Sequence, residues 1–143
     1  MSEVGILLEE GRRRELRQAL FYRLLSADAE NAGDAAAAAR LYDLLADEQH
    51  HVSRLTARLL ELGEKPADEP RGGGHVPPLE GWEGEARRRE ADEVAWYESA
   101  LTRTDDPHTR AILREILASE RQHLEHLGGK WMPAGPTEPE ETS

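Results

Sequence analysis

The feature that most constrains this chain is a pattern that occurs twice, in the same order, once in each half. Each copy contains an Arg-Arg-Arg-Glu run, a tyrosine seven residues after its glutamate, and a Glu-x-x-His pair near its end. Such a repeat predicts a duplicated structural unit that faces its own copy across an approximate two-fold axis. The matching positions are residues 12–15 and 87–90, Tyr22 and Tyr97, and the pairs Glu48/His51 and Glu120/His123.

The composition and the stop signals predict four helices. Leu and Ala carry most of the apolar content, and aromatic residues make up only 5% of the chain, which favours helices over sheets. The Gly33, Gly63 and Gly128 positions follow helical segments, and Asp106-Pro107 has the composition of a helix start. We therefore expect helices at about residues 2–30, 34–62, 80–104 and 107–128.

The lengths of the connections predict the topology. Short turns join the first helix to the second and the third to the fourth, so each pair should form an antiparallel hairpin. A linker at about 64–79, rich in Pro and Gly, is long enough to cross the bundle. We expect one all-α four-helix bundle at 1–128, and a disordered tail at 129–143 because that segment is rich in Pro and Glu.

The register of the Glu-x-x-His pairs predicts a metal site. Residues three apart on a helix point the same way, and oxygen with imidazole nitrogen suits iron, manganese or zinc. Each pair interrupts an otherwise apolar, core-facing stripe, and carboxylates buried there without partners would be very costly. Arg12 and Arg58 lie near the ends of the stripes and are too few to pair with them all. Two divalent ions would provide the missing partners for the carboxylates and imidazoles that the four helices place on these stripes. The candidate ligands are Glu15, Glu48, His51, Glu90, Glu93, Glu120 and His123. The alternatives are a register that is off by one position, with these side chains on solvated faces, and a degenerate site.

The net charge and the absence of cysteine exclude several classes of function. The net charge is −11, which argues against nucleic acid and anionic membranes as partners. No cysteine is present, which excludes disulfides and iron–sulfur clusters. Neither a membrane-length apolar run nor a signal-peptide pattern is visible at the start. We therefore expect a cytoplasmic protein.

The residues named above resemble the rubrerythrin branch of the ferritin-like di-iron superfamily, over about residues 8–127. Glu93, one turn after Glu90, is the feature that favours this branch. The resemblance implies that Glu48 and Glu120 bridge two irons, that Glu15 and Glu90 are terminal ligands, and that Glu93 is a ligand that switches with redox state. It also implies one iron for each of His51 and His123, with Tyr22 and Tyr97 hydrogen-bonding beside the centre.

The chain departs from that family in two ways. Rubrerythrins usually carry a rubredoxin-like domain with four cysteines, which supplies the electrons. This chain has no cysteine, so its electrons would come from a separate donor protein. Bacterioferritins bind haem through a Met just after the bridging Glu, and Gln49 stands there instead, so haem is not expected.

Three functions follow from this resemblance and from the site. The first is an oxidoreductase that reduces hydrogen peroxide or dioxygen. The second is a ferroxidase that serves iron storage or detoxification, and the third is a non-catalytic bundle stabilised by metal. The sequence does not choose between iron, manganese and zinc. A homodimer is expected, and the long linker would permit exchange of a hairpin between chains.

Overall fold

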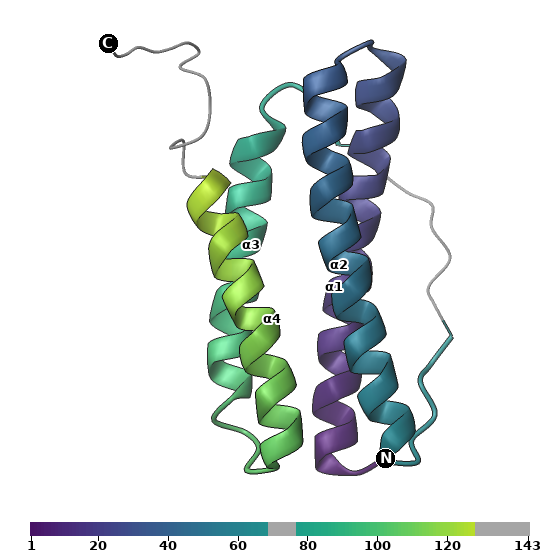
Figure 1. The fold of residues 1–143 in the computed structure, drawn as a ribbon, viewed down its shortest axis with the longest axis vertical. Helices are drawn as coiled ribbons and strands as arrows, with labels where there is room; N and C mark the ends of the chain where they lie inside the picture. Colours follow the sequence, from purple (N-terminus) through teal and green to yellow (C-terminus); the bar gives the residue numbers. More distant parts are fainter. Residues whose placement is uncertain (69–76, 128–143) are drawn as a thin grey trace.

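The computed structural model describes residues 1–68 and 77–127, and within these ranges it contains four helices and no strand. The helices are α1 (Glu3–Asn31), α2 (Ala35–Glu61), α3 (Trp82–Ala100) and α4 (Pro107–Glu125). They form an elongated bundle (Figure 1). The all-α four-helix bundle expected from the sequence is confirmed. The tail predicted at 129–143 and His75 of the linker lie outside the described residues.

The bundle consists of two antiparallel hairpins, α1 with α2 and α3 with α4 (Figure 1). The end of α2 lies beside the start of α1, where Glu64 accepts hydrogen bonds from the Ser2 amide at 3.0 Å and from its hydroxyl at 2.8 Å. The other end of the bundle holds the start of α3, where Trp82 packs in one apolar cluster with Leu41 and Leu44 of α2. The connection from α2 to α3 therefore crosses the length of the bundle, and α3 runs parallel to α2.

Side-chain caps begin three of the helices. Ser2, Asp34 and Asp106 each accept a hydrogen bond from the backbone amide three residues later, at 3.0, 3.1 and 3.0 Å. Such caps satisfy amides that have no partner within the helix. Gly33 ends the turn between α1 and α2 with a positive φ of 72°, a conformation that costs other residues more.

Helix α3 is shorter than the sequence suggested. It ends at Ala100 rather than near residue 104. The guanidinium of Arg110 donates hydrogen bonds to the carbonyl oxygens of Leu101 and Thr104, and the Thr102 hydroxyl donates to that of Ser99. These bonds satisfy carbonyls at the helix end and stabilise the turn that follows.

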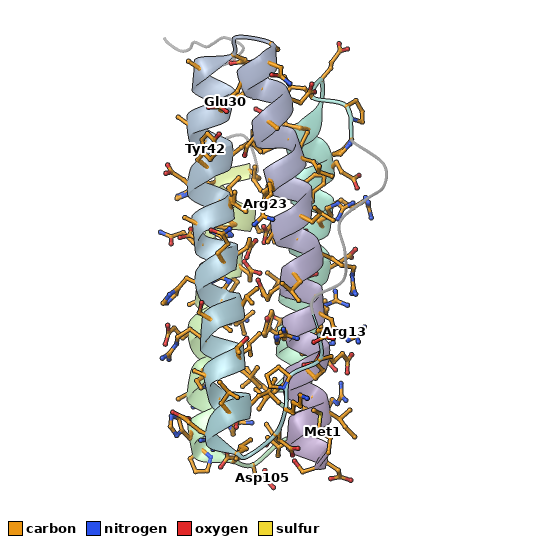
Figure 2. All side chains as sticks on the ribbon, turned by 90° about the vertical axis from the view of Figure 1, so that its right-hand side faces the viewer. Met1, Arg13, Arg23, Glu30, Tyr42 and Asp105 are labelled. Carbon is orange, nitrogen blue, oxygen red and sulfur yellow. The ribbon has the colours of Figure 1, made fainter. Side chains whose placement is uncertain are left out.

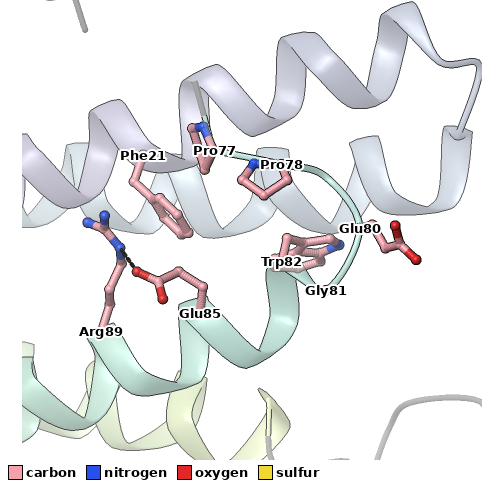
Figure 3. Close-up of a pocket in the computed structure, with 8 residues that line it drawn as sticks. All are labelled: Phe21, Pro77, Pro78, Glu80, Gly81, Trp82, Glu85 and Arg89. Atoms are coloured by element: carbon pink, nitrogen blue, oxygen red, sulfur yellow. Dashed lines mark hydrogen bonds and ion pairs between the residues drawn. The ribbon is translucent and has the colours of Figure 1, made fainter. Parts of the chain in front are cut away.

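The chain enters α3 through a proline-containing segment that packs on α1. Pro77, Pro78, Phe21 and Trp82 line a pocket of about 250 Å³ (Figure 3). At its edge the Arg89 guanidinium lies 4.1 Å from the centre of the Phe21 ring and donates a hydrogen bond to Glu85 at 3.1 Å. None of the candidate metal ligands lines this pocket.

The core is divided into two apolar clusters. The first cluster lies towards the turn between α1 and α2 and includes Tyr22, Leu25 and Leu41. The second lies towards the opposite end and includes Leu8, Leu55 and Leu113. On every helix the buried glutamate and histidine side chains fall in the sequence between the members of these two clusters. The fold therefore encloses a polar layer between two apolar layers.

The outer surface is strongly charged. On the first hairpin, Arg13, Arg23 and Glu30 of α1 are exposed, and Tyr42 of α2 is 43% exposed (Figure 2). Among the described residues, no helix combines the length and the apolar character needed to cross a membrane.

Candidate metal centre

Six side chains from four helices form the polar layer. Glu15 comes from α1 and Glu90 from α3, while α2 and α4 each contribute a Glu-x-x-His pair. None of the six is more than 5% exposed. Because residues three apart share one face of a helix, each pair points a carboxylate and an imidazole into the same space. The six residues are Glu15, Glu48, His51, Glu90, Glu120 and His123.

These side chains form two overlapping groups of four. In each group, one ligand atom from every residue lies within 4.8 Å of the others. Glu48 and Glu120 belong to both groups. A carboxylate has two oxygens, so each of these two residues could contribute a ligand atom to both groups. The first group adds Glu15 and His51, and the second adds Glu90 and His123.

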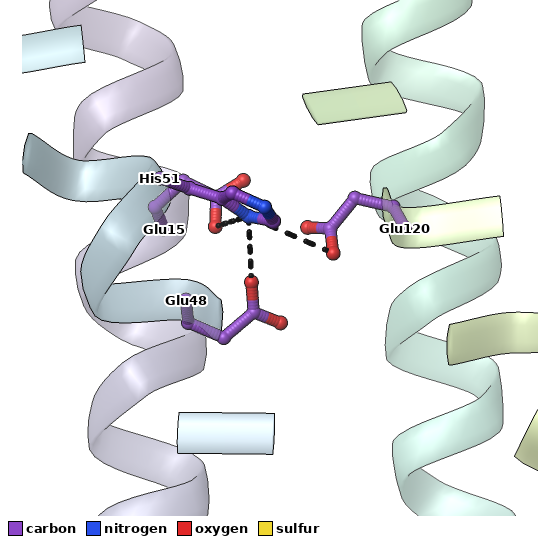
Figure 4. A group of neighbouring side chains, drawn as sticks. All are labelled: Glu15, Glu48, His51 and Glu120. Carbon is purple, nitrogen blue, oxygen red and sulfur yellow. Dashed lines mark hydrogen bonds and ion pairs between the residues drawn. The ribbon is translucent and has the colours of Figure 1, made fainter. Parts of the chain in front are cut away.

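The two imidazoles have similar surroundings. In the first group, His51 Nδ1 lies 3.1 Å from a Glu48 oxygen, 3.3 Å from a Glu15 oxygen and 3.9 Å from a Glu120 oxygen (Figure 4). In the second, His123 Nδ1 lies 3.1 Å from Glu120, 3.6 Å from Glu90 and 3.8 Å from Glu48. The two rings are 6.4 Å apart between their centres. The arrangement follows the approximate two-fold symmetry expected from the repeat.

Two tyrosines hold the outer carboxylates from the opposite hairpin. The Tyr22 hydroxyl donates a hydrogen bond to Glu90 at 2.6 Å, and the Tyr97 hydroxyl donates to Glu15 at 2.5 Å. Burial, and then the charge of the neighbouring carboxylates, raise the pKa of both tyrosines well above the usual value. Both therefore remain protonated donors at neutral pH, as the hydrogen-bonding role predicted for them requires.

Without metal, the four carboxyl groups of the layer differ in their tendency to hold a proton. Burial and the neighbouring carboxylates raise the pKa of Glu48 and Glu120 well above the usual value. Burial also acts to raise the pKa of Glu15 and Glu90, but His51 beside Glu15 and His123 beside Glu90 outweigh it and lower both values. The two central carboxyls therefore tend to hold protons and the two outer ones to be ionised.

Several buried atoms of the layer make no hydrogen bond. They are one oxygen each of Glu48 and Glu90, both oxygens of Glu120, and Nδ1 of His123. Buried polar atoms normally have partners, and all four residues belong to the group around His123. Two divalent cations would balance the charge of the four ionised carboxylates Glu15, Glu48, Glu90 and Glu120. The residues present thus fit a pair of metal ions in both donor type and charge.

Glu93 lies outside both groups. Its carboxylate accepts two hydrogen bonds from the Arg14 guanidinium, at 3.2 and 3.1 Å. Burial raises the pKa of Glu93 to about 7, although Arg14 acts in the opposite direction. The structure therefore places this predicted ligand beside the centre and paired with an arginine.

Three residues of the centre were not predicted from the sequence. Asp47 accepts a hydrogen bond from His123 Nε2 at 2.8 Å, and Gln18 donates one to Glu90 at 3.1 Å. Arg14 is the partner of Glu93. The repeat contained a signal for Gln18, because it stands one turn after Glu15, as Glu93 stands one turn after Glu90. Asp47 directly precedes the bridging Glu48, and only the packing of α4 against α2 reveals its role.

The other described histidines lie away from the centre. His50 is exposed, 3.8 Å from Glu115. His108 accepts a hydrogen bond from Arg58 at 3.2 Å near the start of α4. His126 is half-buried at the end of α4.

A comparison with protein-family models and with curated proteins found no match to this chain.

Proposed function

We propose that this chain is a di-iron protein of the rubrerythrin-like type, which reduces hydrogen peroxide or dioxygen with electrons from a separate donor. The observation that carries the proposal is the sharing of Glu48 and Glu120 by both four-residue groups. Shared carboxylates hold two ions side by side, and an adjacent pair can deliver two electrons to one peroxide. Glu and His ligands suit iron, manganese and zinc, and of these iron readily changes valence in such a site.

The chemistry balances with two electrons and two protons. Hydrogen peroxide takes up both, its oxygen–oxygen bond breaks, and two molecules of water leave. When bound, a reduced metal pair supplies the two electrons at one place. The donor then restores the reduced state, and the chain, which contains no cysteine, offers no thiolate-bound centre of its own for that task.

The surrounding residues would hold this centre in place. Tyr22 and Tyr97 donate hydrogen bonds to Glu90 and Glu15 and so orient them, and each of these outer carboxylates would offer an oxygen to an ion. The apolar clusters on either side limit access of water and increase the strength of charge interactions in the layer. Glu93, which is paired with Arg14 in this structure, is proposed to act as the additional, redox-dependent ligand that the resemblance implies.

The test is reoxidation of the anaerobically reduced, iron-loaded protein. Stopped-flow absorption after mixing with peroxide or with dioxygen should show that peroxide reoxidises the centre much faster. Glu48→Gln, which removes a shared ligand, should abolish the fast phase. Equal rates with the two oxidants would contradict the peroxidase function.

Size-exclusion chromatography after iron loading separates this proposal from iron storage. A small oligomer that holds two irons per chain supports the oxidoreductase. A shell that accumulates many irons per chain would instead support the ferroxidase and storage function.

A further inference from the structure

The two halves of the centre match closely in their inner contacts but differ in their outer ones. The tyrosine bonds are equivalent, since Tyr22 reaches Glu90 and Tyr97 reaches Glu15 at nearly equal distances. The two imidazoles also face matching sets of carboxylates. The differences lie behind the histidines and beside the outer carboxylates.

His123 is supported from behind by a carboxylate. Its Nε2 lies 2.8 Å from Asp47 of α2. A carboxylate only accepts hydrogen bonds, so the proton sits on Nε2 and the Nδ1 lone pair is left facing the centre. Such a partner fixes the orientation of the ring and makes the imidazole a stronger ligand.

His51 has no equivalent support. The residue that corresponds to Asp47 is Ser119, because each directly precedes the Glu of a Glu-x-x-His pair. Within the described residues, the hydrogen bonds of His51 all involve Nδ1 and the carboxylates of the centre itself. Among residues 1–68 and 77–127, no side chain makes a hydrogen bond with Nε2 of His51 that would fix which ring nitrogen carries the proton.

The outer carboxylate beside His123 also has more supporting hydrogen bonds than the one beside His51. Glu90, beside His123, accepts hydrogen bonds from both Tyr22 and Gln18, at 2.6 and 3.1 Å. From described residues outside the six ligands, Glu15 accepts a hydrogen bond from Tyr97 alone. The position equivalent to Gln18 is Glu93, which is held by Arg14 instead. More of the ligands around His123 are therefore fixed before any ion binds.

We propose that the two metal positions are unequal, that the position at His123 fills first and more tightly, and that Asp47 sets this order. This inference rests on the proposed dinuclear centre. The position at His51 is then the exchangeable one, and the protein passes through a state with a single ion. Partners behind a histidine ligand change metal affinity by about 10- to 100-fold, and that is the expected gap between the two binding steps.

The test uses Co²⁺ alone, titrated into metal-free full-length protein and followed by visible absorption and calorimetry. Two steps separated by about 10- to 100-fold are expected. His123→Ala should remove the tight step and His51→Ala the weak one. Asp47→Asn keeps an acceptor for Nε2–H without its charge, so it should weaken the first step and bring the two affinities together. Ser119→Asp supplies the missing carboxylate behind His51 and should strengthen the second step by a similar factor.

Circular dichroism of the metal-free variants establishes that each is folded, and Asp47→Glu should restore part of the first step. Loss of the tight step in His51→Ala rather than His123→Ala would overturn the proposed order. Unchanged affinities in both Asp47→Asn and Ser119→Asp would overturn the role of Asp47. Neither result would contradict the proposed dinuclear centre. A wild-type protein that binds no Co²⁺ would contradict the proposed function itself.

Discussion

The guanidinium of Arg14 and the carboxylate of Glu93 form a two-bond ion pair between α1 and α3, with oxygen–nitrogen distances of 3.2 and 3.1 Å. Arg14 also lies 5.6 Å from the centre of the Trp96 ring. The pair is mostly buried, since the two side chains are 23% and 9% exposed. Under the proposed role of Glu93 as a metal ligand, Arg14 would compete with the ion for this carboxylate.

Arg14→Gln should release Glu93 from this competition. Without the guanidinium, the pKa of Glu93 should rise above its value of about 7, because burial then acts with less opposition. The metal-free protein should lose about 1 to 3 kcal/mol of stability above pH 7, between the values typical of exposed and buried ion pairs. Affinity for the second ion should increase, because a further carboxylate becomes available.

Urea denaturation and Co²⁺ titration measure these two effects. Arg13→Gln is the matched control, because Arg13 is an exposed neighbour that pairs with Glu9. It should change neither quantity by much. A fall in affinity for the second ion in Arg14→Gln would show that Arg14 supports the centre rather than competing with it.

Glu48→Gln should have opposite effects with and without metal. In the metal-free protein, Glu48 is fully buried among like charges, so a neutral amide of the same shape should stabilise the fold by about 1 to 3 kcal/mol at pH 8. In the presence of metal, the variant should lose the increase in melting temperature that metal gives the wild type.

Thermal unfolding with added metal, and again with a chelator, tests both parts. Glu98→Gln provides the control, because Glu98 is exposed on α3 and pairs with Arg121. Its effect should stay within about 0.5 kcal/mol. If metal stabilises Glu48→Gln as much as the wild type, Glu48 is not a ligand.

Helical periodicity was sufficient to predict that the six candidate ligands are buried together. Glu48 and His51 share a face of α2 with Leu41, Leu44 and Leu55, all of which are fully buried, so the polar pair had to be buried as well. The apolar stripe of a helix is visible in the sequence of that helix alone, so the burial of residues within the stripe can be predicted from a single sequence.

Partners across helices were harder to predict. Arg58 interrupts the apolar stripe of α2, and the structure shows that its guanidinium donates to Asp106 at 2.8 Å and to Thr109 at 3.2 Å. It thereby joins the end of α2 to the cap of α4. Asp47 and Arg14 were missed for the same reason, because their partners are on other helices and the relative rotation of two helices is not encoded in either one.

Gly11 and Gly84 should respond in opposite ways to substitution by alanine. A Cβ at Gly11 would lie 3.0 and 3.2 Å from two atoms of the Trp96 ring. That ring is held by a hydrogen bond to Glu10 at 2.8 Å and by an edge contact with Tyr97, so it has little freedom to move. Strain should exceed the helix-propensity gain of about 1 kcal/mol, for a net loss of about 1 kcal/mol. Gly84 has nothing within 4 Å of its Cβ position.

Gly84→Ala should therefore increase the stability of the protein by about 0.5 to 1 kcal/mol. Urea denaturation of the two metal-free variants measures the change in the free energy of unfolding for each. Equal gains in both would mean that Trp96 moves aside without cost, and that α1 and α3 do not require the close approach at Gly11.

The stability of the metal-free protein should fall as pH rises from about 5 to 8. The pKa values of Glu48 and Glu120 are raised well above the usual value by burial and by neighbouring carboxylates. Groups whose pKa is raised in the folded state bind more protons there than in the unfolded chain. Their contribution is therefore complete below the unfolded pKa, and it is lost as pH passes through the folded pKa. Metal reverses this dependence, because bound cations need both carboxylates ionised and affinity therefore increases with pH.

Calorimetry in buffers with different ionisation enthalpies measures the linked protons. At pH 6 to 7, binding of the ions should release protons, mainly from Glu48 and Glu120. His123, whose burial opposes protonation while Glu90 and Asp47 outweigh it and raise its pKa, should add to that release. The same titration on Glu48→Gln should release fewer protons. Metal binding without proton release would mean that the central carboxylates are already ionised, and that the pair of ions is not held between them.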